Sequence, residues 1–161
     1  MEKIIDTSYK NRFEYMQKMH DFMDRKITAE EFERWFMRKR DADIDQDIAN
    51  GYYQYYENKV FSGNELKFQK KYSNYLYHCQ PPEDEYWLSR YSKGVEKYNI
   101  TGETLFLPLY DLLSVKVRDL FHYWNTPAEL FDPNDDIEEE ELRWYCGEIL
   151  RILEKYRNRL T

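Results

Sequence analysis

The sequence predicts an all-α fold: a compact antiparallel bundle of about five or six helices, formed by a single helical domain over residues 1–161. The chain has only 5 Gly and 5 Pro, whereas β-sandwiches usually need more turn residues. Apolar residues recur at spacings of three and four, which is the periodicity of an amphipathic helix. Aromatic residues make up 18% of the chain, enough to build a core and to exclude general disorder.

The first helix is expected from about Ser8 to Asp24, with Ser8 or Thr7 as the N-cap. Its predicted apolar stripe consists of Tyr9, Phe13, Met16, His20 and Met23. A core position is therefore the simplest interpretation of His20.

The clearest boundary is Thr28-Ala29-Glu30-Glu31, a capping box in which Thr28 and Glu31 satisfy each other's amides. Ile27 and Phe32 stand where a hydrophobic staple belongs. The second helix should turn Phe32, Trp35 and Phe36 inward and pack against the first helix as an antiparallel hairpin.

The segment 41–61 is harder to interpret. Four aspartates alternate with other residues, Asn50-Gly51 marks a break, and a tyrosine-rich stretch follows that fits either a helix turn or an extended cover over the core. A third helix is expected at about Glu65–Cys79, with one side formed by Leu66, Tyr72, Tyr75, Leu76 and Cys79. Pro81-Pro82 should end it.

Three longer elements complete the chain. A helix is expected from Glu83 to Tyr98, with acidic residues in its first turn. A long apolar helix should follow over Thr104–Trp124, then a loop over Asn125–Asp135. The last helix should span about Asp136–Arg159, with Asp135 or Asp136 as its cap.

Charge is unevenly placed along the chain. The net charge is −7; residues 1–40 carry a net of +2 and residues 41–161 a net of −9. Nucleic-acid binders need a basic footprint, so we expect no nucleic-acid partner. An acidic face should attract a basic protein.

The expected compartment is the cytoplasm. The N-terminus has charges where a signal peptide needs an apolar run, and no stretch is long and apolar enough for a membrane span. Cys79 and Cys146 are isolated and form neither a disulfide framework nor a metal motif. We therefore expect both cysteines to be reduced thiols. We also expect no membrane partner.

Motifs for catalysis are weak, so we expect no enzyme, cofactor or metal. The run Asp41-x-Asp43-x-Asp45-x-Asp47 fails the Gly and Glu positions of an EF-hand loop in both registers. His20, His78 and His122 lack a metal-ligand partner at helical spacing. His122 is interpreted as a core residue beside Phe121 and Tyr123. A Ser/His/Asp site is not excluded, but no nucleophile elbow is present.

The strongest candidate for function is an acidic stretch near the C-terminus. It contains Glu129, Asp132, Asp135, Asp136, Glu138, Glu139, Glu140 and Glu141, with no basic residue among them. Capping explains only part of this density, because like charges repel. Phe131 and Trp144 are candidate anchors that the carboxylates would surround, whereas Tyr145 is assigned to the core. Asp41, Asp43, Asp45 and Asp47 are a second candidate contact surface.

Two segments carry a family resemblance. Residues 22–32, Phe-Met-Asp-Arg-Lys-Ile-Thr-Ala-Glu-Glu-Phe, resemble the first helix hairpin of the bacterial self-protective, colicin-like immunity proteins. The C-terminal run is similar to theirs in its acidic lead-in, Glu141-Leu142-Arg143, and Glu148 to Lys155. About a third of the chain is covered, and residues 50–100 have no counterpart. The resemblance implies a small helical bundle that blocks a nuclease toxin with acidic residues.

The leading hypothesis is therefore an immunity protein that neutralises a cognate basic toxin, most simply a nuclease, in a 1:1 complex. A phosphate-binding cleft is lined with Lys and Arg, which a carboxylate-dense surface complements. The first alternative is a helical regulatory or scaffold domain that binds another basic protein. The second is a helical enzyme with a carboxylate-based metal site.

Overall fold

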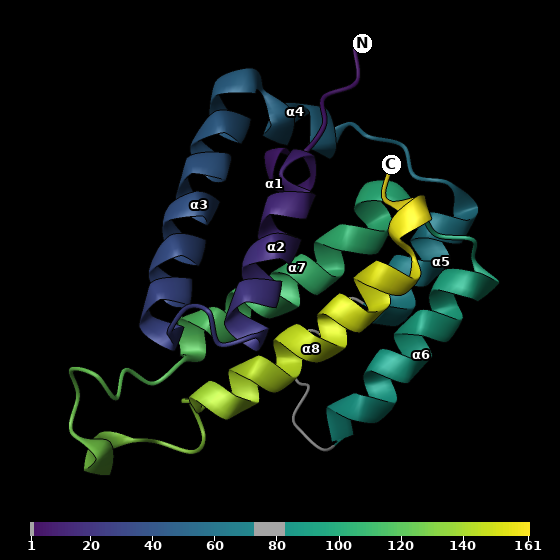
Figure 1. Ribbon diagram of the computed structural model, residues 1–161. Helices are drawn as coiled ribbons and strands as arrows, with labels where there is room; N and C mark the ends of the chain where they lie inside the picture. Colours follow the sequence, from purple (N-terminus) through teal and green to yellow (C-terminus); the bar gives the residue numbers. More distant parts are fainter. Residues whose placement is uncertain (1, 73–82) are drawn as a thin grey trace.

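The computed structural model describes residues 2–72 and 83–161, and over these ranges the fold is all-α, as predicted (Figure 1). The α-helices are α1 Thr7–Lys10, α2 Arg12–Met23, α3 Ala29–Asn50, α4 Tyr52–Glu57, α5 Gly63–Tyr72, α6 Glu83–Lys97, α7 Gly102–Asp119 and α8 Glu139–Lys155. The described residues also include two 3₁₀ turns, Ala128–Leu130 and Arg157–Arg159. Within the described part of the chain, the one extended pairing is an isolated bridge between Leu120 and Ile137.

The N-terminal hairpin forms as expected. Thr28 caps α3 through its side chain, which accepts from the Glu31 amide at 3.1 Å, while the Glu31 carboxylate accepts from the Thr28 amide at 3.1 Å. Phe32 and Phe36 are fully buried and Trp35 packs against the core. The first cap differs from the prediction: Asp6 caps α1 by accepting from the Tyr9 amide at 2.9 Å, so neither Thr7 nor Ser8 is the N-cap.

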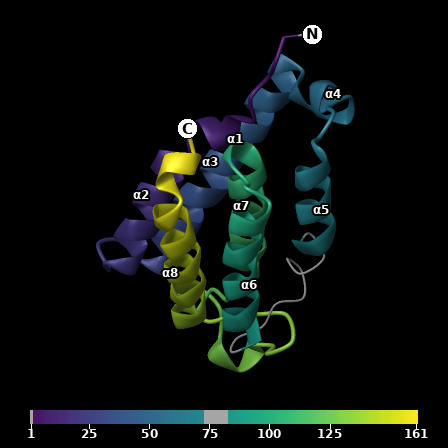
Figure 2. The same ribbon diagram turned by 90° about the vertical axis from the view of Figure 1, so that its right-hand side faces the viewer.

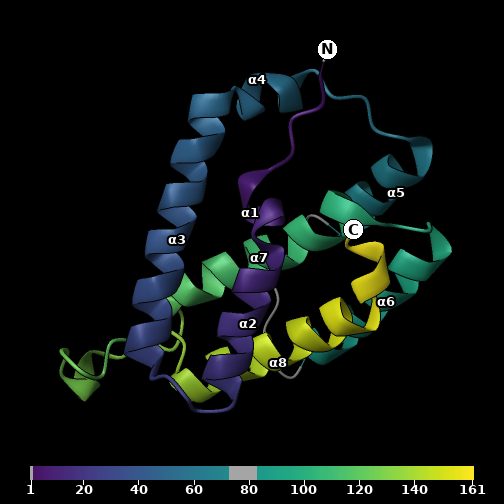
Figure 3. The same ribbon diagram turned by 45° about the horizontal axis from the view of Figure 1, so that its top comes forward.

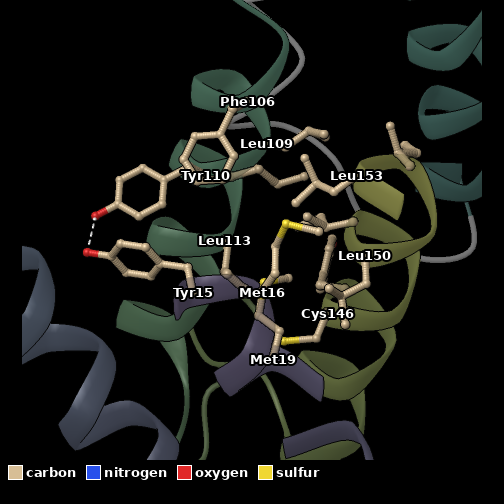
Figure 4. Close-up of a cluster of buried hydrophobic side chains, with 14 of the residues drawn as sticks. Tyr15, Met16, Met19, Phe106, Leu109, Tyr110, Leu113, Cys146, Leu150 and Leu153 are labelled. Atoms are coloured by element: carbon tan, nitrogen blue, oxygen red, sulfur yellow. Dashed lines mark hydrogen bonds between the residues drawn. The ribbon is translucent and has the colours of Figure 1, made fainter. Parts of the chain in front are cut away.

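Helix α8 is central to the packing. It contacts α2, α7 and α6, and it runs antiparallel to α7 (Figures 1 and 2). Leu142, Tyr145 and Cys146 on α8 are fully buried, which confirms Tyr145 as a core residue. Figure 4 shows Met16 and Met19 of α2 lying between Leu113 of α7 and Cys146 and Leu150 of α8. These methionines fill the space between three helices.

The first predicted stripe was partly wrong. Tyr9 and Met16 are buried, but Phe13 is exposed and His20 is half-exposed at the edge of α2. Tyr15 takes an inward position, where its hydroxyl lies 3.3 Å from that of Tyr110 (Figure 4). A stripe that winds slowly round the helix, including Tyr15, Met19 and Phe22, describes the buried face better.

Several helix limits also differ from prediction. Helix α3 continues through the aspartate run to Asn50, where Gly51 adopts a left-handed conformation with φ of 79°. Helix α7 ends at Asp119 and not near Trp124, and α8 begins at Glu139 with Glu138 as its cap residue, so Asp135 and Asp136 do not cap it. On α5, Phe68 and Tyr72 are buried whereas Leu66 is exposed.

Helices α5 and α6 approach closely at Gly94. The Tyr72 ring lies where a Cβ atom on residue 94 would be, at 2.4 Å, so only glycine fits without a shift of Tyr72. The Tyr72 hydroxyl then donates to the Arg90 carbonyl at 2.7 Å. The predicted positions of Tyr75, Leu76 and Cys79, the helix end at Pro81-Pro82, and His78 lie outside the described residues.

Among the helices that the structure describes, none is long and apolar enough to cross a membrane.

Candidate protein-binding surface

The acidic stretch begins in a long loop, residues 120–138, which we call the acidic loop. It leaves the end of α7 and projects from the bundle before returning to α8 (Figures 1 and 3). Its two ends are fastened together, since the Phe121 amide donates to the Ile137 carbonyl and the Ile137 amide donates to the Asp119 carbonyl, both at 2.9 Å. This pairing ends α7 earlier than local apolar periodicity predicts, and it gives the projecting loop a defined base.

Aromatic rings hold the loop together from within. Phe131 packs edge-on against Phe121, with ring centroids 5.4 Å apart, and stacks with Tyr123 at 6.2 Å. Phe121 is buried, but Tyr123 is 43% exposed and Leu130 is 63% exposed. The loop therefore presents apolar surface while its shape is fixed by ring contacts, a combination typical of binding anchors.

Carboxylates surround these rings. The Asp136 side chain accepts from the Asp132 amide, and the Asp132 side chain accepts from the Asn134 amide, both at 2.9 Å, so these two aspartates shape the turn. Asp135 is exposed, and the neighbouring Asp132 raises its pKa through charge repulsion and a side-chain hydrogen bond. Asp135 thus adds negative charge beside the two aspartates that accept from the backbone amides of the turn.

A shallow recess of about 250 Å³ lies between the acidic loop and the helix ends. Its acidic lining consists of Asp119, Asp135, Asp136, Glu138 and Glu141. Lys116 lies at its base, buried, with its ammonium 4.7 Å from the centre of the Tyr145 ring. The recess thus has a strongly negative lining next to the exposed rings of the loop.

The first turn of α8 has a different character. Glu139 and Glu140 form ion pairs with Arg143 at 2.7 and 2.8 Å, and Glu140 is also 3.1 Å from Arg25. Hydrogen bonding from Arg25 lowers the pKa of Glu140. Arg143 is buried with its guanidinium 4.5 Å from the centre of the Phe22 ring. These two glutamates are therefore bound to the fold and contribute less free charge to the surface than their number suggests.

The second predicted contact surface needs a correction. Asp43 and Asp47 are only 2% and 3% exposed. Asp47 accepts from both the amide and the hydroxyl of Thr7, at 2.9 and 2.6 Å. Asp43 accepts from the Tyr15 hydroxyl at 2.6 Å and from the Asn11 side chain at 2.9 Å. Hydrogen bonds to α1 and α2 hold both carboxylates inside, so only Asp41 and Asp45 remain on the surface.

The remaining predicted residues are also placed. Trp144 is partly buried against the core, so it is at most a partial anchor. His122 does not lie in the core: it contacts the Glu33 carboxylate and stacks on Trp124, with ring centroids 4.6 Å apart. His20 is 3.1 Å from Glu154. Neither histidine lies in a group of metal-ligating side chains, because the described ranges contain no such group of three or more.

Tyr123 and Trp124 were missed as surface residues by sequence reasoning. Both lie within the predicted helix Thr104–Trp124, whereas α7 ends at Asp119, five residues before Trp124. The signal that identifies them is the pairing of Leu120 with Ile137, which joins residues far apart in the chain.

Comparisons of this chain with protein-family models, with curated proteins and with solved structures found no match.

Proposed function

We propose that this protein is an immunity protein that binds a cognate basic toxin, a nuclease, in a 1:1 complex and covers its active-site cleft. The observation that carries this proposal is the acidic loop, which exposes Tyr123 and Leu130 within a ring of carboxylates. The resemblance of residues 22–32 and of α8 to colicin-like immunity proteins supports the same conclusion. It is a cytoplasmic function, because the protein must protect the cell that makes the toxin.

The physical argument rests on complementarity. A nuclease holds the phosphates of its substrate with Lys and Arg, and carboxylates placed in that cleft replace the phosphates. Charge complementarity accelerates association, and apolar anchors bury area at the centre of an interface. The acidic loop supplies both features on one projecting segment.

Exposure supports a smaller set of proposed contact residues. Glu129, Asp135 and Glu138 are exposed. Glu138 accepts from the Tyr123 hydroxyl at 3.2 Å, and Asp135 interacts with the Asp132 side chain. Glu139 and Glu140 are tied to Arg143. We therefore assign the primary contact to the loop carboxylates and a secondary contact to Asp41 and Asp45.

The test uses the toxin encoded by the gene immediately before this one, or the native partner isolated from the producing strain. The double variant Asp135→Lys/Glu138→Lys should slow association about 10-fold or more at low salt and flatten its salt dependence. A matched control, Glu2→Lys/Glu57→Lys, makes the same change of charge at exposed positions away from the loop. Equal rates for the two variants would show that the loop is not the interface.

The regulatory or scaffold alternative predicts a different partner for the same loop. In that case the isolated partner is a factor without toxicity, and the gene does not follow a toxin gene. Inhibition of nuclease activity by a stoichiometric amount of this protein distinguishes the two, because a scaffold has no reason to cover an active site.

A further inference from the structure

A second feature lies at the other end of α7, away from the acidic loop. It is a cavity of about 620 Å³ bounded by α1, α3, α4 and the first half of α7. Figure 3 shows α4 following the end of α3, before the chain continues to α5. On α7 the cavity lining extends from Glu103 to Asp111, and Asp111 is 9 residues before the start of the acidic loop, which corresponds to about 14 Å along a helix. The two features are thus separate surfaces.

One wall of the cavity is a row of aromatic rings from the tyrosine-rich segment. The Tyr52 and Tyr56 centroids are 5.9 Å apart, and the Tyr56 and Phe61 centroids are 5.8 Å apart. Tyr52 is buried, whereas Tyr53 and Tyr56 are exposed. Tyr110 adds a further ring from α7. Ring faces carry negative electrostatic potential and attract cations.

Another part of the lining is acidic. Asp6 is only 9% exposed; its Oδ1 accepts from the Tyr9 amide, and no donor from the described chain contacts Oδ2. Glu103 and Asp111 also line the cavity and form no hydrogen bond or ion pair with residues in the described ranges. These three carboxylates retain acceptor capacity toward the cavity, so this part of the lining is suited to a ligand that donates hydrogen bonds.

Two further details give the wall the same polarity. Pro108 stands within α7 and lacks an amide, so the Thr104 carbonyl at the cavity loses its usual helical donor. Asp47 also lines the cavity, although its carboxylate already accepts a hydrogen bond from Thr7. Against four carboxylates the lining has two cations, Arg40 and Lys59, and Lys59 lies 5.0 Å from the Phe61 ring centre. The lining is therefore net negative.

We propose that this cavity binds a small organic cation, an ammonium or guanidinium group on an apolar stem. The charged head would donate to Asp6 and Glu103, and the stem would lie along the Tyr52, Tyr56 and Phe61 rings. An anion would meet an excess of carboxylates, and a neutral apolar molecule would leave the Glu103 and Asp111 carboxylates without a donor. The volume suits a small-molecule site. This inference goes beyond the proposed function and does not depend on it.

The site should be stronger above neutral pH. Burial raises the pKa of Asp6 to about 7, and Asp47, Glu103 and Asp111 raise it further, while its hydrogen bond from Tyr9 acts in the other direction. Asp111 is exposed, yet desolvation by the surrounding cavity residues raises its pKa to about 6, opposed by Arg40. The other groups that face Asp6 across the cavity are Lys59 and the hydroxyls of Tyr52, Tyr53 and Tyr56. Cation binding requires the ionised carboxylates, so affinity should fall as the pH drops from 8 to 5.5.

The experiment is calorimetric titration of the whole protein with 1,5-diaminopentane and with agmatine, and with 1,5-pentanediol as the neutral control of the same length. We expect the two cations to bind saturably and the diol not to bind. Amide chemical shifts should move around α4 and the first half of α7 and not in the acidic loop. Equal binding of the diol, shifts confined to the acidic loop, or absence of saturation by both cations would overturn the proposal.

Single substitutions test whether the proposed cavity residues hold the cation. Glu103→Gln keeps an oxygen acceptor but removes the charge, and should weaken diamine binding about 10-fold. Tyr56→Leu should weaken it a few-fold while Tyr56→Phe retains it, since only the ring face is required. Glu57→Gln, on the same helix but outside the cavity lining, is the matched control. Undiminished binding by Glu103→Gln would overturn the assignment, as would a basic peptide that occupies the cavity when the diamine does not.

Discussion

The two acidic segments of this protein look alike in sequence and differ in the structure. In residues 41–47, every second residue is aspartate, yet Asp43 and Asp47 are buried and hydrogen-bonded to α1 and α2. In the acidic loop, Asp135 and Glu138 are exposed on a segment that projects from the bundle. Density of carboxylates therefore does not identify a binding surface. What separates the two is whether neighbouring elements offer hydrogen-bond donors.

Periodicity explains the first case. Asp43 and Asp47 are four residues apart and continue the buried face of α3 that begins with Phe32 and Phe36. On a helix this spacing places them on the same side. Opposite them lie polar groups of α1 and α2, namely Thr7, Asn11 and the Tyr15 hydroxyl. The buried face of α3 is thus apolar in its first half and polar in its second half.

The largest expected effect comes from breaking the buried network. Asp43→Ala leaves the Tyr15 hydroxyl and the Asn11 amide without their acceptor, and should lower the free energy of unfolding by about 3 kcal/mol. Urea denaturation measures the change. Asp45→Ala, two residues away and exposed, is the matched control and should stay within about 0.5 kcal/mol of wild type. Similar losses for the two variants would remove the distinction between the segments.

A second substitution separates the structural acids of α8 from the loop acids. Arg143→Ala removes ion pairs to Glu139 and Glu140 and the packing on Phe22, and should cost about 2 kcal/mol. Arg151→Ala removes an exposed ion pair to Glu148 on the same helix, and should cost about 0.5 kcal/mol or less. Thermal or urea unfolding of both variants gives the comparison. If Arg143→Ala lowers the free energy of unfolding no more than Arg151→Ala does, then Glu139 and Glu140 are not held by Arg143 and should be counted among the free surface charges.

Sequence reasoning predicted the parts of this fold that depend on local patterns. The capping box at Thr28 and the inward Phe32 and Phe36 are confirmed, because caps and helical stripes are encoded within a few residues. The end of α7 at Asp119 was not predictable, since it depends on the pairing of Leu120 with Ile137. The cavity was not predictable either, because Asp6, Tyr56 and Glu103 are far apart in the sequence and come together only in the folded chain.

The candidate surface was predicted in part for the same reason. The sequence located the acidic stretch near the C-terminus, and Asp135 and Glu138 are exposed there as expected. It did not reveal that Arg143 ties down Glu139 and Glu140, although the spacing of three and four residues to Arg143 is visible in the sequence. Nor did it reveal that Tyr123 is exposed, because that follows from the early end of α7.

The third prediction concerns the pH dependence of stability that the buried Asp6 carboxylate causes. Its folded pKa of about 7 lies above the ordinary value of 3.8, chiefly because of burial. The folded state therefore binds more protons than the unfolded state between about pH 4 and pH 7, so stability should fall as pH rises through this window. Asp6→Asn keeps the acceptor for the Tyr9 amide and should flatten this slope. Between pH 6 and pH 8 the unfolding free energy of wild type should fall by about 1.4 kcal/mol more than that of the variant. A slope identical to that of wild type would show that Asp6 is ionised throughout.

The smallest effect concerns the loop itself. Asp135 is fully exposed, and repulsion from Asp132 raises its pKa, so the ionised form is disfavoured in the folded protein. The sign is the same as for Asp6: stability should fall slightly as pH rises above the ordinary aspartate value, and Asp135→Asn should be marginally more stable than wild type near neutral pH. If the loop has the proposed role, the same substitution should slow capture of the toxin. For Asp135→Asn, the thermal unfolding temperature should therefore rise slightly while the association rate falls. Asp43→Asn, by contrast, should lower the unfolding temperature. A substitution that lowered both stability and association at Asp135 would place this residue with the structural aspartates of α3, because a carboxylate retained only for binding has no stabilising contact to lose.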